Sequence, residues 1–164
     1  MVRAIVVMGV AGCGKSTLAA ALAEALGWTF IEGDRCHPPA NVAKMAAGIA
    51  LDDADRAPFL AAVGDALAGA PGGAVASCSA LRRRYRDALR ARVGEILFVL
   101  PVVPPGILAA RLAARRDHFM PGALLESQIA ALEPPEEDER ALLVDGEAPV
   151  AAQLAAVCAA LAPA

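Results

Sequence analysis

The sequence has few of the residues that hold small secreted domains and zinc modules together. It contains 164 residues but only four cysteines and two histidines. The cysteines are widely spaced and form no CxxC pair, so neither a disulfide framework nor a zinc site is indicated. We therefore expect reduced thiols.

Long uncharged hydrophobic segments are also missing. The two longest uncharged stretches, residues 96–110 and 148–164, contain prolines and are too short to cross a bilayer. Only residues 2–8 precede the first glycine-rich segment, which leaves no pattern of a signal or transit peptide. The sequence thus predicts a protein that does not interact with membranes and lies in the cytoplasm.

An excess of positive charge is absent as well. The formal net charge is −3, which argues against a general nucleic-acid-binding protein. The arginines are nevertheless clustered, in one group between residues 82 and 92 and in a second between residues 111 and 116. This uneven distribution favours a small anion as ligand.

Five short apolar runs alternate with helical patterns along the chain. The runs are typical of strands that are buried on both faces of a parallel sheet. Predicted strands cover residues 4–8, 28–32, 74–78, 96–100 and 141–144, and predicted helices cover residues 15–26, 55–68, 81–93, 105–116 and 150–161. This order predicts one α/β domain over residues 1–164, a doubly wound five-stranded parallel sheet with helices on both faces. Ligands then bind at the carboxyl ends of the strands.

The segment GVAGCGKS, residues 9–16, matches the phosphate-binding pattern GxxxxGK[ST] directly after a strand and before a helix. Its glycines let backbone N–H groups and the helix N-terminus face negative charge, although a ligand-free turn is the simpler alternative. Lys15 is predicted to bridge the β- and γ-phosphates of ATP, and Ser16 to hold Mg²⁺. The predicted nucleotide-binding residues are Gly9, Val10, Ala11, Gly12, Cys13, Gly14, Lys15, Ser16 and Thr17.

The group that receives the phosphate has to be inferred from segments outside this loop. Asn41 is the single asparagine, so the guanine-reading segment Asn-Lys-x-Asp is missing and a regulatory GTPase is disfavoured. The chain instead contains GDRCHPPANVAKMAAG from residue 33, DADRAPFL from 53, SCSALRRRYRDALR from 77 and RRDHFMPGALLESQIAALEPP from 115. Over almost the whole chain these segments resemble the gluconate kinase (gluconokinase) family, which is related to the shikimate kinases.

The resemblance implies ATP-dependent phosphorylation of D-gluconate at its 6-hydroxyl, a homodimer, and a short arginine-bearing lid at about residues 115–124. It also implies that Arg56 holds the substrate carboxylate. A kinase for another small anionic acceptor such as shikimate is one alternative, and an ATP-dependent switch module is a second. The sequence departs from the family pattern at Ala50, Phe59, Arg82 and Asp117.

Acidic residues near the strand ends are the candidates for catalysis. Asp34 follows the second strand, where a carboxylate can accept the proton of the attacking hydroxyl or hold Mg²⁺ through water. It could also be a turn or helix-capping aspartate. Asp145, at the end of the fifth strand, is the competing acid, and the resemblance favours Asp34.

The remaining candidates would bind the acceptor. His37 can donate to a hydroxyl or carboxylate, or cap the next helix, and Lys44 is either a ligand or an exposed lysine. Arg83 and Arg86, three apart on a helix, can present charge to one pocket, whereas Arg82 and Arg84 are expected to face solvent. The predicted substrate-binding residues are Asp34, His37, Lys44, Arg56, Ser79, Arg83 and Arg86.

The second arginine group lies at the end of a predicted helix. Arg111 and Arg115 are placed to contact the phosphates of ATP from the lid, or to interact with the helix dipole. We predict both as ATP-binding residues. The predicted catalytic residues are Lys15, Asp34 and Arg115.

Overall fold

The chain folds around a sheet of five parallel strands. The computed structural model describes residues 2–115 and 122–162. The sheet has the order β2-β3-β1-β4-β5, and every neighbouring pair is parallel. The predicted sheet is therefore confirmed, with the strands β1 (Ala4–Val7), β2 (Thr29–Glu32), β3 (Ala74–Ser77), β4 (Ile96–Val102) and β5 (Ala141–Asp145).

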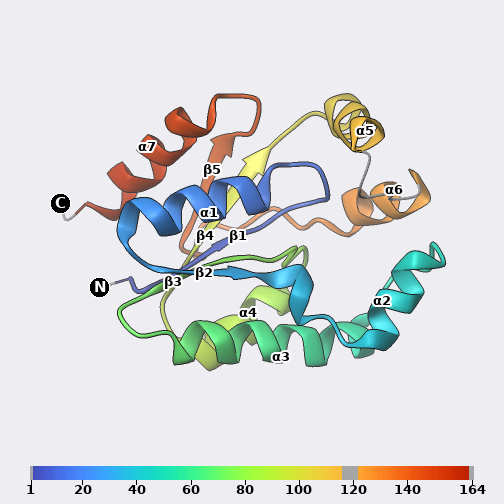
Figure 1. Ribbon diagram of the computed structural model, residues 1–164, viewed down its shortest axis with the longest axis horizontal. Coiled ribbons are helices and arrows are strands. Elements are labelled where there is room, and N and C mark those ends of the chain that lie inside the picture. The colour runs from blue at the N-terminus through green and yellow to red at the C-terminus, as the bar shows by residue number, and fades with distance from the viewer. Residues whose placement is uncertain (1, 116–121, 163–164) are drawn as a thin grey trace.

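Helices cover both faces of this sheet, as predicted (Figure 1). One face carries α1 (Lys15–Leu26) and α7 (Val150–Leu161), and the other carries α3 (Asp53–Gly69) and α4 (Arg83–Val93). From β1 the chain continues to β2 at one edge of the sheet, and from β4 it continues to β5 at the other edge. In sheets of this kind, ligands bind at the carboxyl ends of the two strands where the direction changes, here β1 and β4. Beyond these ends lie the short turn η1 (Gly33–Cys36) and the helices α2 (Pro39–Ala46), α5 (Pro105–Ala114) and α6 (Gly122–Ala131).

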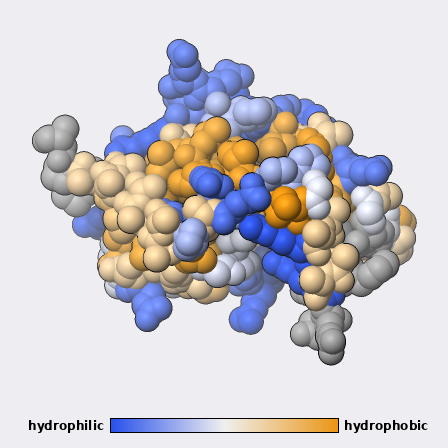
Figure 2. All heavy atoms as spheres, turned by 90° about the horizontal axis from the view of Figure 1, so that it is seen from above, coloured by the Kyte–Doolittle hydropathy of each residue, from blue (hydrophilic) through white to orange (hydrophobic). Residues whose placement is uncertain are grey.

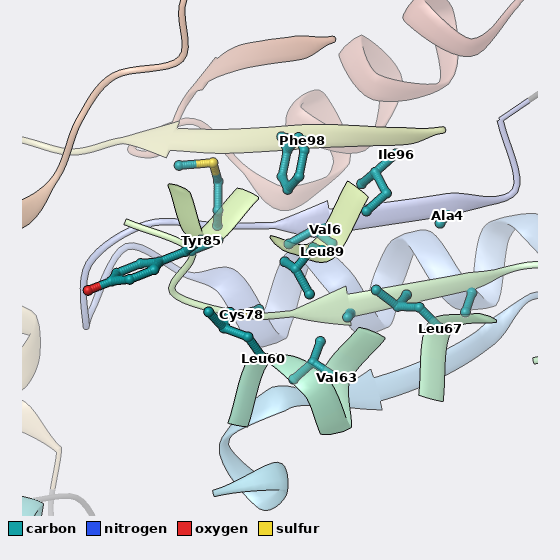
Figure 3. Close-up of a cluster of buried hydrophobic side chains, with 14 of the residues drawn as sticks. Ala4, Val6, Leu60, Val63, Leu67, Cys78, Tyr85, Leu89, Ile96 and Phe98 are labelled. Carbon is teal, nitrogen blue, oxygen red and sulfur yellow. The ribbon is translucent and has the colours of Figure 1, made fainter. Parts of the chain in front are cut away.

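The core consists of one apolar layer on each face of the sheet. Alternate residues of β1 point to opposite faces, so Val6 packs with Leu60 and Leu89 of the α3 and α4 layer (Figure 3). Ile5 packs in the layer that contains Leu18 of α1. Because both faces are covered, the central strands carry apolar residues at successive positions rather than at every second one.

The beginning of α3 is fixed by a capping box. The Asp52 carboxylate accepts from the Asp55 N–H at 2.8 Å, and the Asp55 carboxylate accepts from the Asp52 N–H at 3.0 Å. An aspartate thus caps the helix that contains Pro58. The helix begins earlier than the predicted range of 55–68, because the cap at Asp52 allows it to start at Asp53.

α6 was not among the predicted helices. Its ten residues bury Leu124 and Leu125 and carry neither an acidic first turn nor a basic last turn. A helix this short is marginal in isolation, and α6 is held by packing, because Leu125 belongs to an apolar cluster with Val10 and Leu108. Tertiary contacts of this kind leave little trace in local sequence.

The outer surface of α7 reflects its alanine content. α7 has the sequence VAAQLAAVCAAL and buries Gln153 and Val157. Figure 2 shows weakly hydrophobic residues over the part of the surface next to the C-terminal end, where α7 lies. None of the helices in the described ranges is long and apolar enough to cross a membrane.

A substitution at Gly33 tests how tightly β2 and β3 approach each other. A Cβ atom on Gly33 would lie 1.9 Å from the backbone oxygen of Ser77. Gly33→Ala should therefore force the two strands apart and lower the free energy of unfolding by about 3 kcal/mol, measured by urea denaturation. The control is Gly69→Ala at the end of α3, where the added Cβ meets open space and a neutral or stabilising effect is expected. Equal stability of the two variants would contradict the close approach.

Candidate functional site

The loop between β1 and α1, residues 9–16, forms an open cradle, which we call the phosphate loop. Gly9, Gly12 and Gly14 have φ angles of 129°, 83° and 94°, which side chains with a Cβ rarely adopt. Gly14 is the N-cap of α1 and contributes no side-chain cap. The first N–H groups of α1 therefore have no capping acceptor and are available to an anion.

Two side chains at the start of α1 complete this cradle. The ammonium group of Lys15 donates to the Val10 carbonyl at 3.0 Å, which holds it over the loop. The Ser16 hydroxyl donates to Glu32 Oε1 at 3.0 Å. Glu32 is the last residue of β2 and also accepts a hydrogen bond from the Ser77 hydroxyl. We did not predict Glu32, although an acidic strand end beside the phosphate loop is a signal that could have identified it.

A cavity of about 400 Å³ lies beside the phosphate loop, and we call it the loop cavity. Arg111 crosses its wall and donates to the carbonyls of Gly12 at 3.2 Å and of Gly146 at 2.9 Å. Gln153 donates to the Ala148 carbonyl at 2.9 Å, and its own side-chain oxygen is buried without a partner in the described part of the chain. The lining includes Gly12, Gly14, Thr17, Arg111, Arg115, Gly146, Ala148 and Gln153.

The loop cavity gathers several of the predicted nucleotide-binding residues. Gly12, Cys13, Gly14 and Thr17 line it together with Arg111 and Arg115. Arg115 is exposed directly after α5, at the edge of the described residues. The remaining lid segment, residues 116–121, which includes Arg116 and Asp117, lies outside the described residues.

A second cavity, of about 620 Å³, lies between the beginnings of α3 and α4 and the helix α6, and we call it the arginine cavity. The guanidinium carbons of Arg56 and Arg84 lie 5.4 and 5.5 Å from the ring centre of Tyr85. Arg84 also pairs with Asp53. Arg84 is exposed, as expected, and lines this cavity together with Arg82, which is half-buried. Both lie at the start of α4, where three helices converge.

Asp34, His37 and Arg56 lie in one neighbourhood at the end of β2. Asp34 is exposed in η1, so Glu32 rather than Asp34 closes the strand. His37 stacks on Phe59 with ring centres 3.8 Å apart, and the charges of Asp34 and Arg56 both act on it. Burial raises the pKa of the Cys78 thiol to about 12, and Lys15 and Asp34 both act on that thiol. Asp34 itself lines neither of the two cavities.

The stacking of His37 leads to a testable pKa. Burial lowers the pKa of His37 below its ordinary value of 6.5, since the lowering by Arg56 adds to burial and the raising by Asp34 does not offset it. Folding then favours the neutral ring, so this contribution to stability is present above pH 6.5 and is lost as the pH falls through the folded pKa. An NMR titration should give a midpoint below 6.5 in the folded protein and an ordinary one in urea. A folded midpoint at or above 6.5 would contradict the burial.

Other predicted substrate-binding residues have protein partners. Lys44 forms an ion pair with Asp55 at 2.8 Å. Ser79 is half-buried, and its carbonyl accepts from the Gly9 N–H at 3.1 Å, which joins the segment after β3 to the phosphate loop. The Asp145 carboxylate accepts from the Glu147 N–H at 2.9 Å and so serves a turn.

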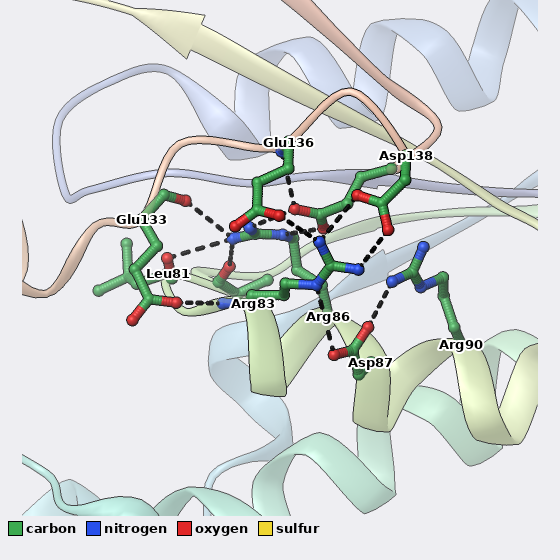
Figure 4. A network of polar contacts seen from close by, with 10 residues as sticks. Leu81, Arg83, Arg86, Asp87, Arg90, Glu133, Glu136 and Asp138 are labelled. Carbon is green, nitrogen blue, oxygen red and sulfur yellow. Dashed lines mark hydrogen bonds and ion pairs between the residues drawn. The ribbon is translucent and has the colours of Figure 1, made fainter.

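Arg86 and Arg83 pair with an acidic segment (Figure 4) and line neither cavity. Arg86 is fully buried and donates to both oxygens of Glu139 at 2.6 and 2.7 Å, and also to the carbonyls of Ala80, Leu81 and Glu133. Arg83 pairs with Glu136 and Asp138, each at 2.6 Å. The structure therefore does not bring these two arginines to the substrate side, because the acids of residues 133–139 lie along α4.

Comparison with known proteins identifies the family. Residues 5–135 match a family model described as an AAA domain. A gluconokinase from Gluconobacter oxydans (strain 621H) is 53% identical over 148 residues, which cover 88% of this chain and 83% of that protein. The chain belongs to the gluconokinase family. A solved gluconokinase from Sinorhizobium meliloti 1021 shares 46% identity and covers 96% of this chain and 94% of its own, with a TM-score of 0.85.

A second solved structure agrees with this gluconokinase fold. The unliganded sugar kinase from Janibacter sp. HTCC2649 superposes with a TM-score of 0.91 at 39% identity, over 98% of this chain and 95% of its own. The resemblance to the gluconokinase family that the motifs indicated is thus confirmed. A kinase of this P-loop class uses ATP.

Proposed function

We propose that the protein transfers the γ-phosphoryl group of ATP, with Mg²⁺, to the 6-hydroxyl of D-gluconate, giving 6-phospho-D-gluconate and ADP. The observation that carries the proposal is the arrangement of the site in a gluconokinase-family chain. The phosphate loop follows the carboxyl end of β1, and the arginine cavity lies at the start of α4, after the carboxyl end of β3. The bond between the γ-phosphorus and its bridging oxygen breaks as the substrate oxygen bonds to phosphorus.

The donor set of the phosphate loop fits the polyphosphate of ATP. The uncapped N–H groups of α1 and the Lys15 ammonium would hold the phosphates and compensate the charge that develops in the transition state. Arg115 and Arg111, on the wall of the loop cavity, would add charge on the other side. Closure of residues 115–124 as a lid would exclude water.

Mg²⁺ fits the oxygen atoms beside Ser16. The described residues contain no group of three or more acidic, cysteine or histidine side chains that could hold a metal by themselves. Mg²⁺ commonly takes only one or two protein ligands and completes its shell with waters and phosphates. The Ser16 hydroxyl would hold it directly, and Glu32 and Asp34 through water. When bound, the ion would neutralise developing phosphate charge.

The acceptor end of the site fits a sugar acid. Arg56 and Arg82 line the arginine cavity, and neither is ion-paired with a carboxylate of the described residues. Arg56 would bind the gluconate carboxylate, and the neutral His37 and Ser79 would bind hydroxyls. Asp34 would accept the proton of the attacking 6-hydroxyl. By resemblance to the family we also propose that the protein lies in the cytoplasm and forms a homodimer. Light scattering on the purified protein would test the dimer.

An ADP-release assay with D-gluconate, shikimate and adenosine monophosphate as separate acceptors tests the proposed function. Turnover of gluconate alone is expected. Turnover of shikimate or of the nucleotide without gluconate would overturn the choice of acceptor. ATP hydrolysis that no small molecule stimulates would instead favour a switch module.

The role of Arg56 can be read from the Michaelis constant. Arg56→Met should raise the KM for gluconate by about tenfold or more and change kcat less, because it removes a charged partner of a carboxylate that does not react. The matched control is Arg84→Met, since Arg84 already pairs with Asp53. An unchanged KM in Arg56→Met would assign the carboxylate to another cation, with Arg82 as the next to test.

A further inference from the structure

α6 lines the arginine cavity and also contacts the phosphate loop. Ser127, Ala130 and Ala131 of this helix line the arginine cavity. They are three and four residues apart and so share one face. The side-chain oxygen of Gln128, which directly follows Ser127, accepts a hydrogen bond from the Ala11 N–H of the phosphate loop at 2.7 Å. One short helix thus connects the arginine cavity with the phosphate loop.

This hydrogen bond joins segments that are 117 residues apart in the sequence. Apolar packing supports it, because Leu125 shares a buried cluster with Val10 and Cys13 of the loop. Directly after α6, the Glu133 N–H donates to the Leu81 carbonyl at 2.8 Å, next to Arg82. The helix is therefore held to the phosphate loop at Gln128, and the chain just after it is held at Glu133 to Leu81, the residue before Arg82.

Because α6 has few buried residues, the hydrogen bond of Gln128 contributes much to holding the helix in place. Within the helix, Leu124 and Leu125 are the residues that are fully buried, so its position depends on few contacts. Ala11 precedes the N–H groups at the start of α1, which face the phosphate site. The Ala11 N–H already donates to Gln128. It is therefore not one of the N–H groups left for the phosphates, and the bond can persist when a nucleotide is present.

We propose that Gln128 is a positioning residue that couples the two substrate sites. It sets the distance between the phosphate loop and the helix that walls the arginine cavity, so that an acceptor ordering α6 also orders the loop for ATP. The inference rests on the proposed function, because it assigns the loop cavity to the nucleotide and the arginine cavity to gluconate. Gln128 itself touches neither reacting atom.

The test measures the affinity of each ligand with and without the other. Calorimetry would give the Kd of a non-hydrolysable ATP analogue with Mg²⁺, alone and with saturating D-gluconate. In the unmodified protein the second ligand should tighten the first by about fivefold or more, and by the same factor in the reverse experiment. In Gln128→Met, which keeps the length but loses the oxygen, the factor should fall to about one, with kcat reduced and the KM for gluconate changed less.

Gln128→Glu and Glu126→Gln serve as a rescue variant and a control for Gln128→Met. Gln128→Glu retains an acceptor oxygen and should restore most of the coupling, although its negative charge should weaken binding of the analogue. Glu126→Gln changes an exposed residue of the same helix and should leave both the coupling and kcat unaltered. Gln128→Ala repeats the test if the methionine variant does not melt cooperatively.

The results separate this inference from the proposed function. If the unmodified protein phosphorylates gluconate but the two ligands bind independently, or if Gln128→Met keeps the full coupling factor and kcat, the positioning role is overturned and the function stands. If neither gluconate turnover nor gluconate binding is found, the proposed function fails first.

Discussion

An Asp34→Asn variant is expected to phosphorylate D-gluconate with a kcat lower by about 10²- to 10⁴-fold, whereas its Kd for ATP changes little. The amide keeps the size of the side chain but cannot accept the proton of the attacking hydroxyl. Asp34 is exposed in η1, so the substitution should not disturb the core. Single-turnover kinetics and calorimetry would separate chemistry from binding.

The matched control is Asp145→Asn. Asp145 is also an exposed acid at a strand end, but its carboxylate accepts from the Glu147 N–H, so we expect a kcat near that of the unmodified protein. If Asp34→Asn retained comparable activity, Asp34 would lose the role of base. A large loss in Asp145→Asn together with that result would transfer the role to Asp145.

Arg86→Ala is expected to lower the free energy of unfolding by about 3–5 kcal/mol, because it leaves the buried carboxylate of Glu139 without its partner. Hydrogen bonding to Arg86 lowers the pKa of Glu139. The stabilisation is therefore present at neutral pH and is lost as the pH falls through the folded pKa of Glu139. Urea denaturation at pH 7 measures the loss.

Two further variants serve as comparisons for Arg86→Ala. Arg84→Ala removes an arginine of the same helix from an exposed pair with Asp53, and its effect should be much smaller. The double variant Arg86→Met with Glu139→Leu removes both buried charges and should recover much of the stability that Arg86→Ala loses. Equal stability of Arg86→Ala and Arg84→Ala would contradict a buried pair.

The sequence predicted the frame of the molecule because the strongest signals are local. Apolar runs such as residues 4–8 and 96–100 mark strands that are covered on both faces, and the spacing of Gly9, Gly14 and Lys15 places the loop and α1. The strand positions and the gluconokinase family were therefore confirmed. Boundaries were less accurate, since β4 continues to Val102, two residues past its predicted end.

The candidate site was harder to predict because its geometry depends on distant partners. A run of arginines on α4 does not reveal which of them meets an acid, and Arg86 is paired with a glutamate 53 positions away. The Glu32 carboxylate is held by hydrogen bonds from Ser16 and Ser77, which lie on two other elements. The roles assigned to Asp34, His37 and Arg56 stay predictions until the variants are measured.

The burial of two thiols has a practical consequence for spectroscopy. Cys13 and Cys78 are buried, whereas Cys36 and Cys158 are half-buried. Maleimide reagents, which need an accessible thiolate, would therefore attach a dye at Cys36 in η1 or at Cys158 in α7, and not in the phosphate loop. A fluorophore pair on these two residues would report, by energy transfer, any change in the distance between η1 and α7 during turnover.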